Sequence, residues 1–420
     1  MVTSKQIHEA GAVRIVHSVF VIISSRTEFN CLLFLSSDYD WAVGISRNCL
    51  RLICLWPRES CGKRKLLDNL CVMTIVLTFS VFVVIPSVLL LLKQNDLKTI
   101  IDDGSYCIAA LSLVPKFLII HGKRSVILNV LNMMAIDWEK SKTDEEKNIM
   151  FYYANIARVG SILGFTFGFI AIFLITILPK FGIQVRHTED GLDMFPYPCY
   201  YVFDVSRSPY YEIIYTIQIF MMALILLSYI GIHMFFGTLF LHICGQAKNL
   251  RARIENEKKF EDFRRTMTSI VSDHLRVIRM VKMIESTFSQ ILVTMIIIFG
   301  VITCAYLTSI ISMFAESDTI SLTRLSYLVF SICTNLVQML FYFLTGQELA
   351  NQSEGIYDAT YECGWLNLKS NEAKSLILVM VRSQKPLIVT AGKLFPVTFL
   401  TFGGVMKLSF SYVSFLLTML

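Results

Sequence analysis

The chain has 420 residues, of which 55% are hydrophobic and only 17% charged, and its mean hydropathy is +0.59. A soluble globular domain carries about 25% charged residues, so this composition excludes an ordinary soluble enzyme or binding domain. The net charge of +6 needs no nucleic-acid partner, because basic loops that face an anionic inner leaflet account for it.

Seven apolar blocks are long enough to cross a bilayer, which takes about 20 residues of helix. The blocks do not alternate apolar with polar residues, so they predict helices and not the strands of a barrel. We therefore expect an all-α membrane protein with seven transmembrane helices. The expected spans are residues 70–92, 104–121, 152–178, 212–243, 285–314, 325–345 and 395–418.

Three segments outside these spans have their own character. Residues 1–37 form an atypical N-terminal extension whose apolar run, 15–24, is too short to cross a bilayer. The loop 244–284 and the segment 371–391 repeat apolar residues at helical spacing. We expect helices that project beyond the fourth and fifth spans, and a separate helix that ends near Pro386 and Gly392.

Basic residues predict the orientation, because cytoplasmic loops are enriched in Lys and Arg. The N-terminal segment and the second, fourth and sixth loops hold 29 of the 38 basic residues, whereas the other three loops hold six. This bias places the N-terminus in the cytoplasm and, with seven spans, the C-terminus outside. The only glycosylation sequon, at Asn351, then faces the cytoplasm and stays unused.

No catalytic motif, Walker loop or metal-ligand spacing occurs, so we expect neither an enzyme nor a cofactor. Cys107 and Cys199 lie near the expected outer face. They either form a disulfide or remain free and buried, which is the commoner state of cysteine. Ionisable residues within spans are candidates for function; the lysines and arginines inside the expected spans are Lys116, Arg158 and Lys407.

Residues from three spans could form an apolar cavity with few polar groups, which is typical of a small-molecule site. The third span carries Gly160, Gly164 and Gly168 at four-residue spacing, a pattern that suits either plain helix packing or a pocket floor. The candidate ligand-binding residues are Gly164, Phe167, Gly168, Tyr215, Gln218, Met222, Tyr327 and Phe330.

The last span places small or weakly polar residues and bulky apolar residues on one helical face. This face holds Thr401, Gly404, Leu408, Ser411, Phe415 and Met419. A helix that lines a pore in a symmetric oligomer would have this pattern, and so would a face that packs against other helices. The spacing alone favours neither.

Several motifs resemble those of the insect odorant receptors, and their order and spacing hold over residues 37–420. The segment 37–44 reads Ser-Asp-Tyr-Asp-Trp-Ala-Val-Gly, with Leu-Trp-Pro at 55–57. Phe-Pro-Tyr-Pro at 195–198, Ser-Pro-Tyr-Tyr-Glu at 208–212 and Leu-His-Ile-Cys-Gly-Gln at 241–246 follow. The C-terminal block matches best, with Tyr361, Trp365, Pro386, Ala391-Gly392-Lys393, Phe395-Pro396, Thr401-Phe402, Lys407 and Ser411-Tyr412.

The resemblance implies a multi-pass plasma-membrane receptor of olfactory neurons with a cytoplasmic N-terminus. It implies a ligand-gated, non-selective cation channel, assembled as a heterotetramer with co-receptor subunits and opened by a small volatile organic ligand. The last helix would line the pore, with Ser411, Phe415, Thr418 and Met419 as candidate pore residues. The odorant pocket would lie among the outer halves of the second, third, fourth and sixth spans.

Two departures refine this expectation. The stretch 411–418 lacks the C-terminal signature of the gustatory receptors, and the fourth loop lacks the length expected of the co-receptor, so a ligand-tuning subunit is favoured. Residues 1–37 exceed the usual start of the family and suggest an overextended gene model. The alternatives are a G-protein-coupled receptor, which needs the reverse orientation, and a membrane transporter.

Overall fold

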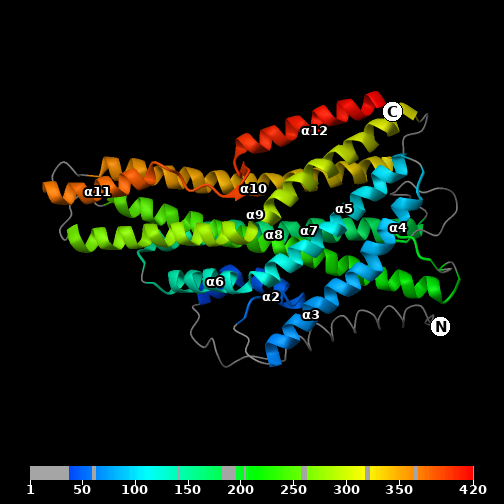
Figure 1. Ribbon diagram of the computed structural model, residues 1–420, viewed down its shortest axis with the longest axis horizontal. Helices are drawn as coiled ribbons and strands as arrows, with labels where there is room; N and C mark the ends of the chain where they lie inside the picture. The colour runs from blue at the N-terminus through cyan, green and yellow to red at the C-terminus, as the bar shows by residue number, and fades with distance from the viewer. Residues whose placement is uncertain are drawn as a thin grey trace.

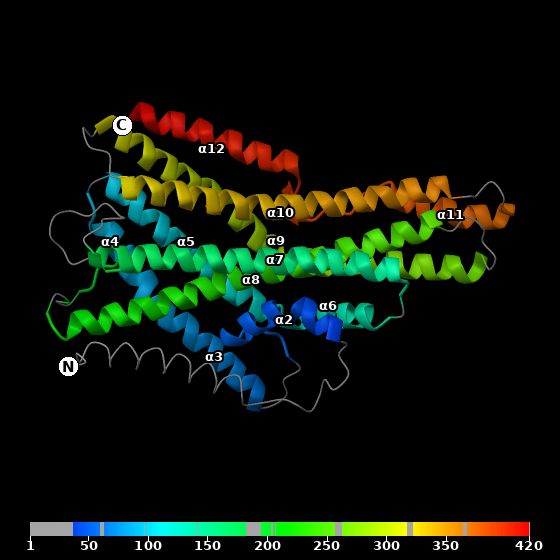
Figure 2. The same cartoon turned by 180° about the vertical axis from the view of Figure 1, so that it is seen from behind.

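The computed structural model describes residues 37–58, 63–95, 97–140, 142–181, 195–202, 205, 207–256, 263–316, 322–363 and 368–419. Within these ranges the chain is a bundle of long helices with one small hairpin (Figures 1 and 2). The predicted N-terminal extension, 1–37, lies outside the described residues except for Ser37, where the first helix begins.

The elements follow one another in chain order. They are α2 (Ser37–Leu52), α3 (Lys63–Phe79), η1 (Ser80–Val84, a π-helix), α4 (Ile85–Lys93), α5 (Leu97–Gly122), α6 (Arg124–Glu139), α7 (Asp144–Ile177), η2 (Leu178–Phe181, a 3₁₀ helix), α8 (Tyr210–Asn256), α9 (Phe263–Glu316), α10 (Leu322–Glu362), α11 (Ser370–Ser383), β1 (Thr390–Ala391), β2 (Phe395–Pro396) and α12 (Phe399–Met419).

The predicted spans are confirmed as helices. Six helical stretches are long and apolar enough to cross a membrane within the described residues, and they contain the first six predicted spans except for Leu178, which begins η2. They run over Lys65–Lys93, Thr99–Gly122, Asp144–Ile177, Tyr210–Asn256, Phe263–Phe314 and Leu322–Glu362. The seventh is α12, whose 21 residues reach about 31 Å at 1.5 Å per residue. Its predicted start at 395 is four residues early, because Phe395 and Pro396 form β2.

The two helical segments predicted outside the membrane are also present. α8 continues to Asn256 and α9 begins at Phe263, so the loop 244–284 is helical on both sides of residues 257–262. α11 stops at Ser383, before Pro386, and a tight hairpin leads into α12. Gly392 turns this hairpin with a φ of +63°, and its amide donates to the Ser289 carbonyl of α9 at 2.8 Å.

A buried polar network joins four helices at one end of the bundle. The Asp137 carboxylate of α6 lies 3.1 Å from His242 Nε2 of α8 and 2.8 Å from Arg276 Nε of α9. Arg253 bridges Glu146 of α7 and Asp273 of α9, at 2.9 and 2.5 Å. Buried charges persist when they are paired in this way, so this end is tied together by ion pairs as well as by apolar packing.

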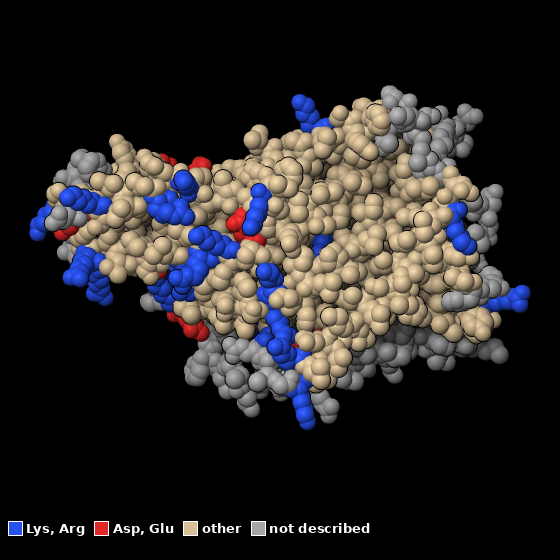
Figure 3. Space-filling view, in the orientation of Figure 1, with Lys and Arg blue, Asp and Glu red and all other residues tan. Residues whose placement is uncertain are grey.

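Basic side chains collect at the same end. Figure 3 shows Lys and Arg over the part of the molecule where α11 and the adjoining ends of α8 and α9 lie, while the broad opposite part is almost free of charge on this face. This separation matches a bundle whose charge-poor part sits in hydrocarbon. We call the basic end the inner end and the opposite end the outer end.

Candidate functional site

The three glycines of α7 are sites of close helix packing. A Cβ added at Gly168 would come within 2.1 Å of Leu226 and 2.7 Å of Ile230, and one at Gly164 within 3.3 Å of Ile230. Gly160 likewise lies against Phe341. The small residues therefore let α7 approach α8, as close-packing glycines do in membrane bundles. Their predicted part in ligand binding remains a prediction.

The predicted residues of α8 lie on one buried face. Gln218 accepts a hydrogen bond from the Tyr197 amide at 3.1 Å and donates to the Tyr201 hydroxyl at 3.1 Å. The Tyr215 hydroxyl donates to the Thr176 carbonyl of α7 at 2.9 Å. Both side chains are buried, and each has polar partners as buried groups require. This part of α8 is thus fixed to α7 and to the segment 195–202.

The predicted residues of α10 join α5 and α7. The Tyr327 hydroxyl is hydrogen-bonded to the Tyr106 hydroxyl of α5 at 2.5 Å. Phe330 packs edge-on against Phe167 of α7, with ring centroids 6.1 Å apart. The last predicted ligand residue, Met222, lies in a buried cluster that Tyr106 also contacts. Tyr106 therefore connects the predicted residues of α8 and α10, and the candidate site is continuous from helix to helix.

The candidate site includes residues that sequence reasoning missed. Besides Tyr106 they are Tyr197, whose hydroxyl donates to the Tyr106 carbonyl, and Asp102, which binds Ser309 and Arg324 at 2.5 Å each. Two signals were available: aromatic residues near the predicted outer ends, and opposite charges at the outer ends of the second and sixth spans. The Asp102–Arg324 pair closes the outer end of the site by tying α5 to α10.

The side chain of Lys116 is buried in the middle of the bundle. Its Nζ lies 3.3 Å from His233 Nε2 and 4.6 Å from the centre of the Tyr229 ring. The other ring nitrogen of His233, Nδ1, lies 2.5 Å from the Tyr342 hydroxyl. The chain thus places a hydrogen-bonded bridge from α5 through α8 to α10 below the candidate site.

One apolar cavity lies beside this bridge, and it holds about 10 Å³, roughly one water. None of the predicted ligand residues lines it. Its walls come from α3, α5 and α8, through Ile75, Val76, Phe79, Leu113, Val114, Phe117, Leu224, Ile225 and Ser228. A ligand held by the predicted residues would therefore lie outside this cavity.

The other two ionisable residues within spans lie at the surface of the single chain. Arg158 stacks over Trp41 at 4.5 Å and donates to its carbonyl, so it fastens α7 to α2. Lys407 is exposed on α12. Cys107 and Cys199 are not joined by a disulfide, and the Cys199 sulfur lies 3.7 Å from Ser87 Oγ instead, so the disulfide alternative for this pair is wrong. Cys54 and Cys71 form a disulfide instead.

α12 packs on α9 and α10 through one face only. Phe402 lies against Phe343 of α10, with centroids 5.7 Å apart, and Ser409 and Val413 are buried. The predicted pore face lies opposite, and its members Gly404, Leu408, Ser411 and Phe415 are exposed. The side chains of Thr418 and Met419 are outside the described residues. Packing inside this chain therefore does not explain the pattern of that face.

Comparison with known proteins adds independent evidence. The 7tm Odorant receptor family matches residues 96–410. Odorant receptor 10 of Aedes albopictus is 24% identical over 334 residues, which cover 77% of this chain and 85% of that protein. Odorant receptor Or2 of Anopheles gambiae is 24% identical over 345 residues, with the same coverage.

A solved structure shares the fold. The insect olfactory receptor OR5 from Machilis hrabei, in complex with eugenol, superposes with a TM-score of 0.78 at 17% identity and covers 91% of this chain and 100% of its own. Because the family match spans most of the chain, the assignment does not depend on this likeness. The protein is a multi-pass membrane receptor, not an enzyme, and it belongs to the seven-transmembrane odorant receptor family.

Proposed function

We propose that this chain is the odorant-binding subunit of a ligand-gated, non-selective cation channel that it forms with co-receptor subunits in the plasma membrane. The observation that carries the proposal is the exposed face of α12. Gly404, Leu408 and Ser411 are exposed there, and Phe415 on the same face is 51% exposed. Such a mixed face suits contact with permeating ions and with copies of the same helix better than contact with lipid alone.

The ligand would bind in the outer half of the bundle, between α7, α8 and α10. Phe167, Phe330 and Met222 supply apolar surface there, while Tyr215, Gln218 and Tyr327 supply a few polar groups. A small volatile molecule would be held mainly by shape and apolar burial. The eugenol complex of the Machilis hrabei receptor is a precedent for such a ligand.

Binding would open the channel through differential affinity. A ligand shifts a closed–open equilibrium only as far as it binds the open state more tightly. The predicted residues lie on helices that the Tyr106–Tyr327 and Lys116–His233–Tyr342 hydrogen bonds connect. A ligand that separates Phe167 of α7 from Phe330 of α10 would therefore act on α10, one of the two helices against which α12 packs.

The test is electrical recording from cells that carry this chain with or without a co-receptor, challenged with a panel of volatile compounds. We expect ligand-evoked cation currents only in the co-expressing cells, and no change when G-protein signalling is blocked. Currents that need a G protein would favour the G-protein-coupled receptor, and ligand uptake without a co-receptor would favour the transporter. Either result would overturn the proposal.

A further inference from the structure

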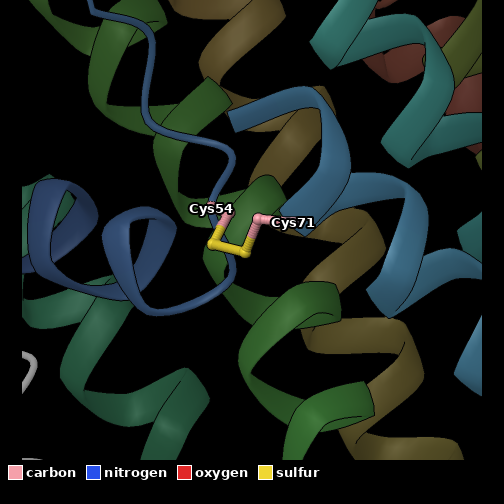
Figure 4. Close-up of a disulfide and its surroundings, with 2 residues drawn as sticks. All are labelled: Cys54 and Cys71. Atoms are coloured by element: carbon pink, nitrogen blue, oxygen red, sulfur yellow. A yellow bond between two sulfur atoms is a disulfide. The ribbon is translucent and has the colours of Figure 1, made fainter. Parts of the chain in front are cut away.

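Cys54 and Cys71 form a disulfide where the turn after α2 meets α3 (Figure 4). Cys54 lies in the turn that follows α2, and Cys71 in the first half of α3. Their Cα atoms are 6.3 Å apart, within the range that a disulfide spans without backbone movement. The fold alone therefore brings the two sulfurs into bonding position.

This pair lies on the side of the membrane where disulfides are unusual. Lys63 and Lys65 begin α3 only a few residues before Cys71, and the basic bias places this end in the cytosol. Thioredoxin and glutathione keep cytosolic thiols reduced, and disulfides found there are usually transient or redox-sensing. A permanent structural bond is thus not expected at this position.

We propose that Cys54 and Cys71 are a reversible oxidation site, open as two thiols in the resting cytosol and closed as a disulfide under peroxide. In closure, two thiols and one hydrogen peroxide give one disulfide and two waters. The two electrons pass from the sulfurs to the peroxide oxygens, and the thiol protons leave in the waters. A cytosolic dithiol returns both electrons and restores the two thiols. The proposal depends on the predicted orientation and not on channel activity.

The bond connects a loosely held helix to the core. Around Cys54 the chain is anchored, since Ile53 and Leu55 are buried and Trp56 packs on Phe235 of α8, with centroids 5.7 Å apart. The inner part of α3, by contrast, leaves Leu66, Leu67 and Leu70 exposed. Oxidation would fasten α3 to α8 through this turn and restrict the inner end of the first span.

The redox state can be read by differential alkylation. Free thiols in intact cells are blocked with N-ethylmaleimide, and disulfides are then reduced and labelled with a second reagent. Trypsin places Cys54 on 52–58 and Cys71 on 66–93, while Cys49 falls on 48–51. Cys49 is the internal control, because burial raises its pKa to about 11 and the thiolate is the reactive form.

We expect the second label to be low at both Cys54 and Cys71 in resting cells, to rise at least fivefold at both after brief peroxide treatment, and to fall again on recovery. Cys49 should not change. In Cys71→Ser, peroxide should leave Cys54 without the second label, and Cys54→Ser should do the same for Cys71. In the purified chain, oxidation should raise the melting temperature, and either variant should abolish that rise.

Two results would overturn the proposal. Full second labelling of both cysteines in resting cells would mean a permanent bond, as expected of an extracellular site. No labelling after peroxide would mean that the pair does not close. Because the assay needs no current, neither result bears on whether the chain is a subunit of an odorant-gated channel.

Discussion

The two halves of α8 differ in how completely they are buried. Every residue from 230 to 245 is buried, whereas only six of the first twenty, 210–229, are. A helix covered on all sides is a core element, and the inner half of α8 is packed by α2, α7, α9 and α10. The outer half is packed on one face, where Tyr215, Gln218 and Met222 lie. Tight packing thus belongs to the inner half of α8, and the ligand binding that we propose falls on its outer half.

The first prediction tests the packing of the inner half. Phe235 is fully buried and contacts Trp56 and Phe288, so Phe235→Ala should destabilise the chain by about 3–5 kcal/mol. Phe220, in the outer half of the same helix, is 57% exposed. Phe220→Ala should stay within about 0.5 kcal/mol. Thermal melts in detergent followed by size-exclusion chromatography measure both, and equal effects would break the contrast between the halves.

The second prediction concerns the hinge that leads into α12. A Cβ at Gly346 would lie 2.0 Å from the Val397 carbonyl oxygen. This oxygen belongs to the backbone, so it cannot move aside as the end of a flexible side chain can. Gly346→Ala should therefore cost about 2 kcal/mol, in the range of overpacked cores. Gly403 has open space around its Cβ position, so Gly403→Ala is the matched control. A Gly346→Ala chain with wild-type melting would mean that this contact is looser than described.

The third prediction concerns the outer half. Tyr327→Phe removes the hydroxyl that bonds Tyr106 and should cost about 1 kcal/mol. It should also change the relative responses to a panel of volatile ligands. Tyr106→Phe should give the same loss, and the double variant little more, because both remove one bond. Tyr412→Phe, at an exposed position, serves as the control; fully additive losses would argue against a shared bond.

The long apolar runs, and the helical spacing of apolar residues, explain which parts of the fold could be predicted. All seven spans and the helical loop 244–284 follow from length and spacing. The helix α6 was not predicted, although Ile127, Val130, Leu131 and Met134 recur at helical spacing. The start of α12 was placed early because Phe395 and Val397 extend the apolar run through the hairpin.

Contacts between residues far apart in the chain could not be predicted from the sequence. Cys54 and Cys71 are 17 residues apart in no recognisable motif, and Lys116 meets His233 across 117 residues. The residue pattern on this face of α12 was predictable from the sequence. Whether the face packs inside the chain or is exposed can be told only when the packing face of α12 is known. Phe402, Ser409 and Val413 define that packing face, and Ser411 and Phe415 lie on the opposite side of the helix.

The central claim, that the exposed face of α12 meets permeating ions, is tested most directly by single-channel recording with a co-receptor. Phe415 is 51% exposed on the proposed pore face, and Phe410 is 56% exposed on a lateral face of the same helix. Neither alanine variant should change stability by more than about 0.5 kcal/mol. We expect Phe415→Ala to alter unitary conductance or ion selectivity while Phe410→Ala leaves both unchanged. Wild-type permeation in both variants would contradict the claim.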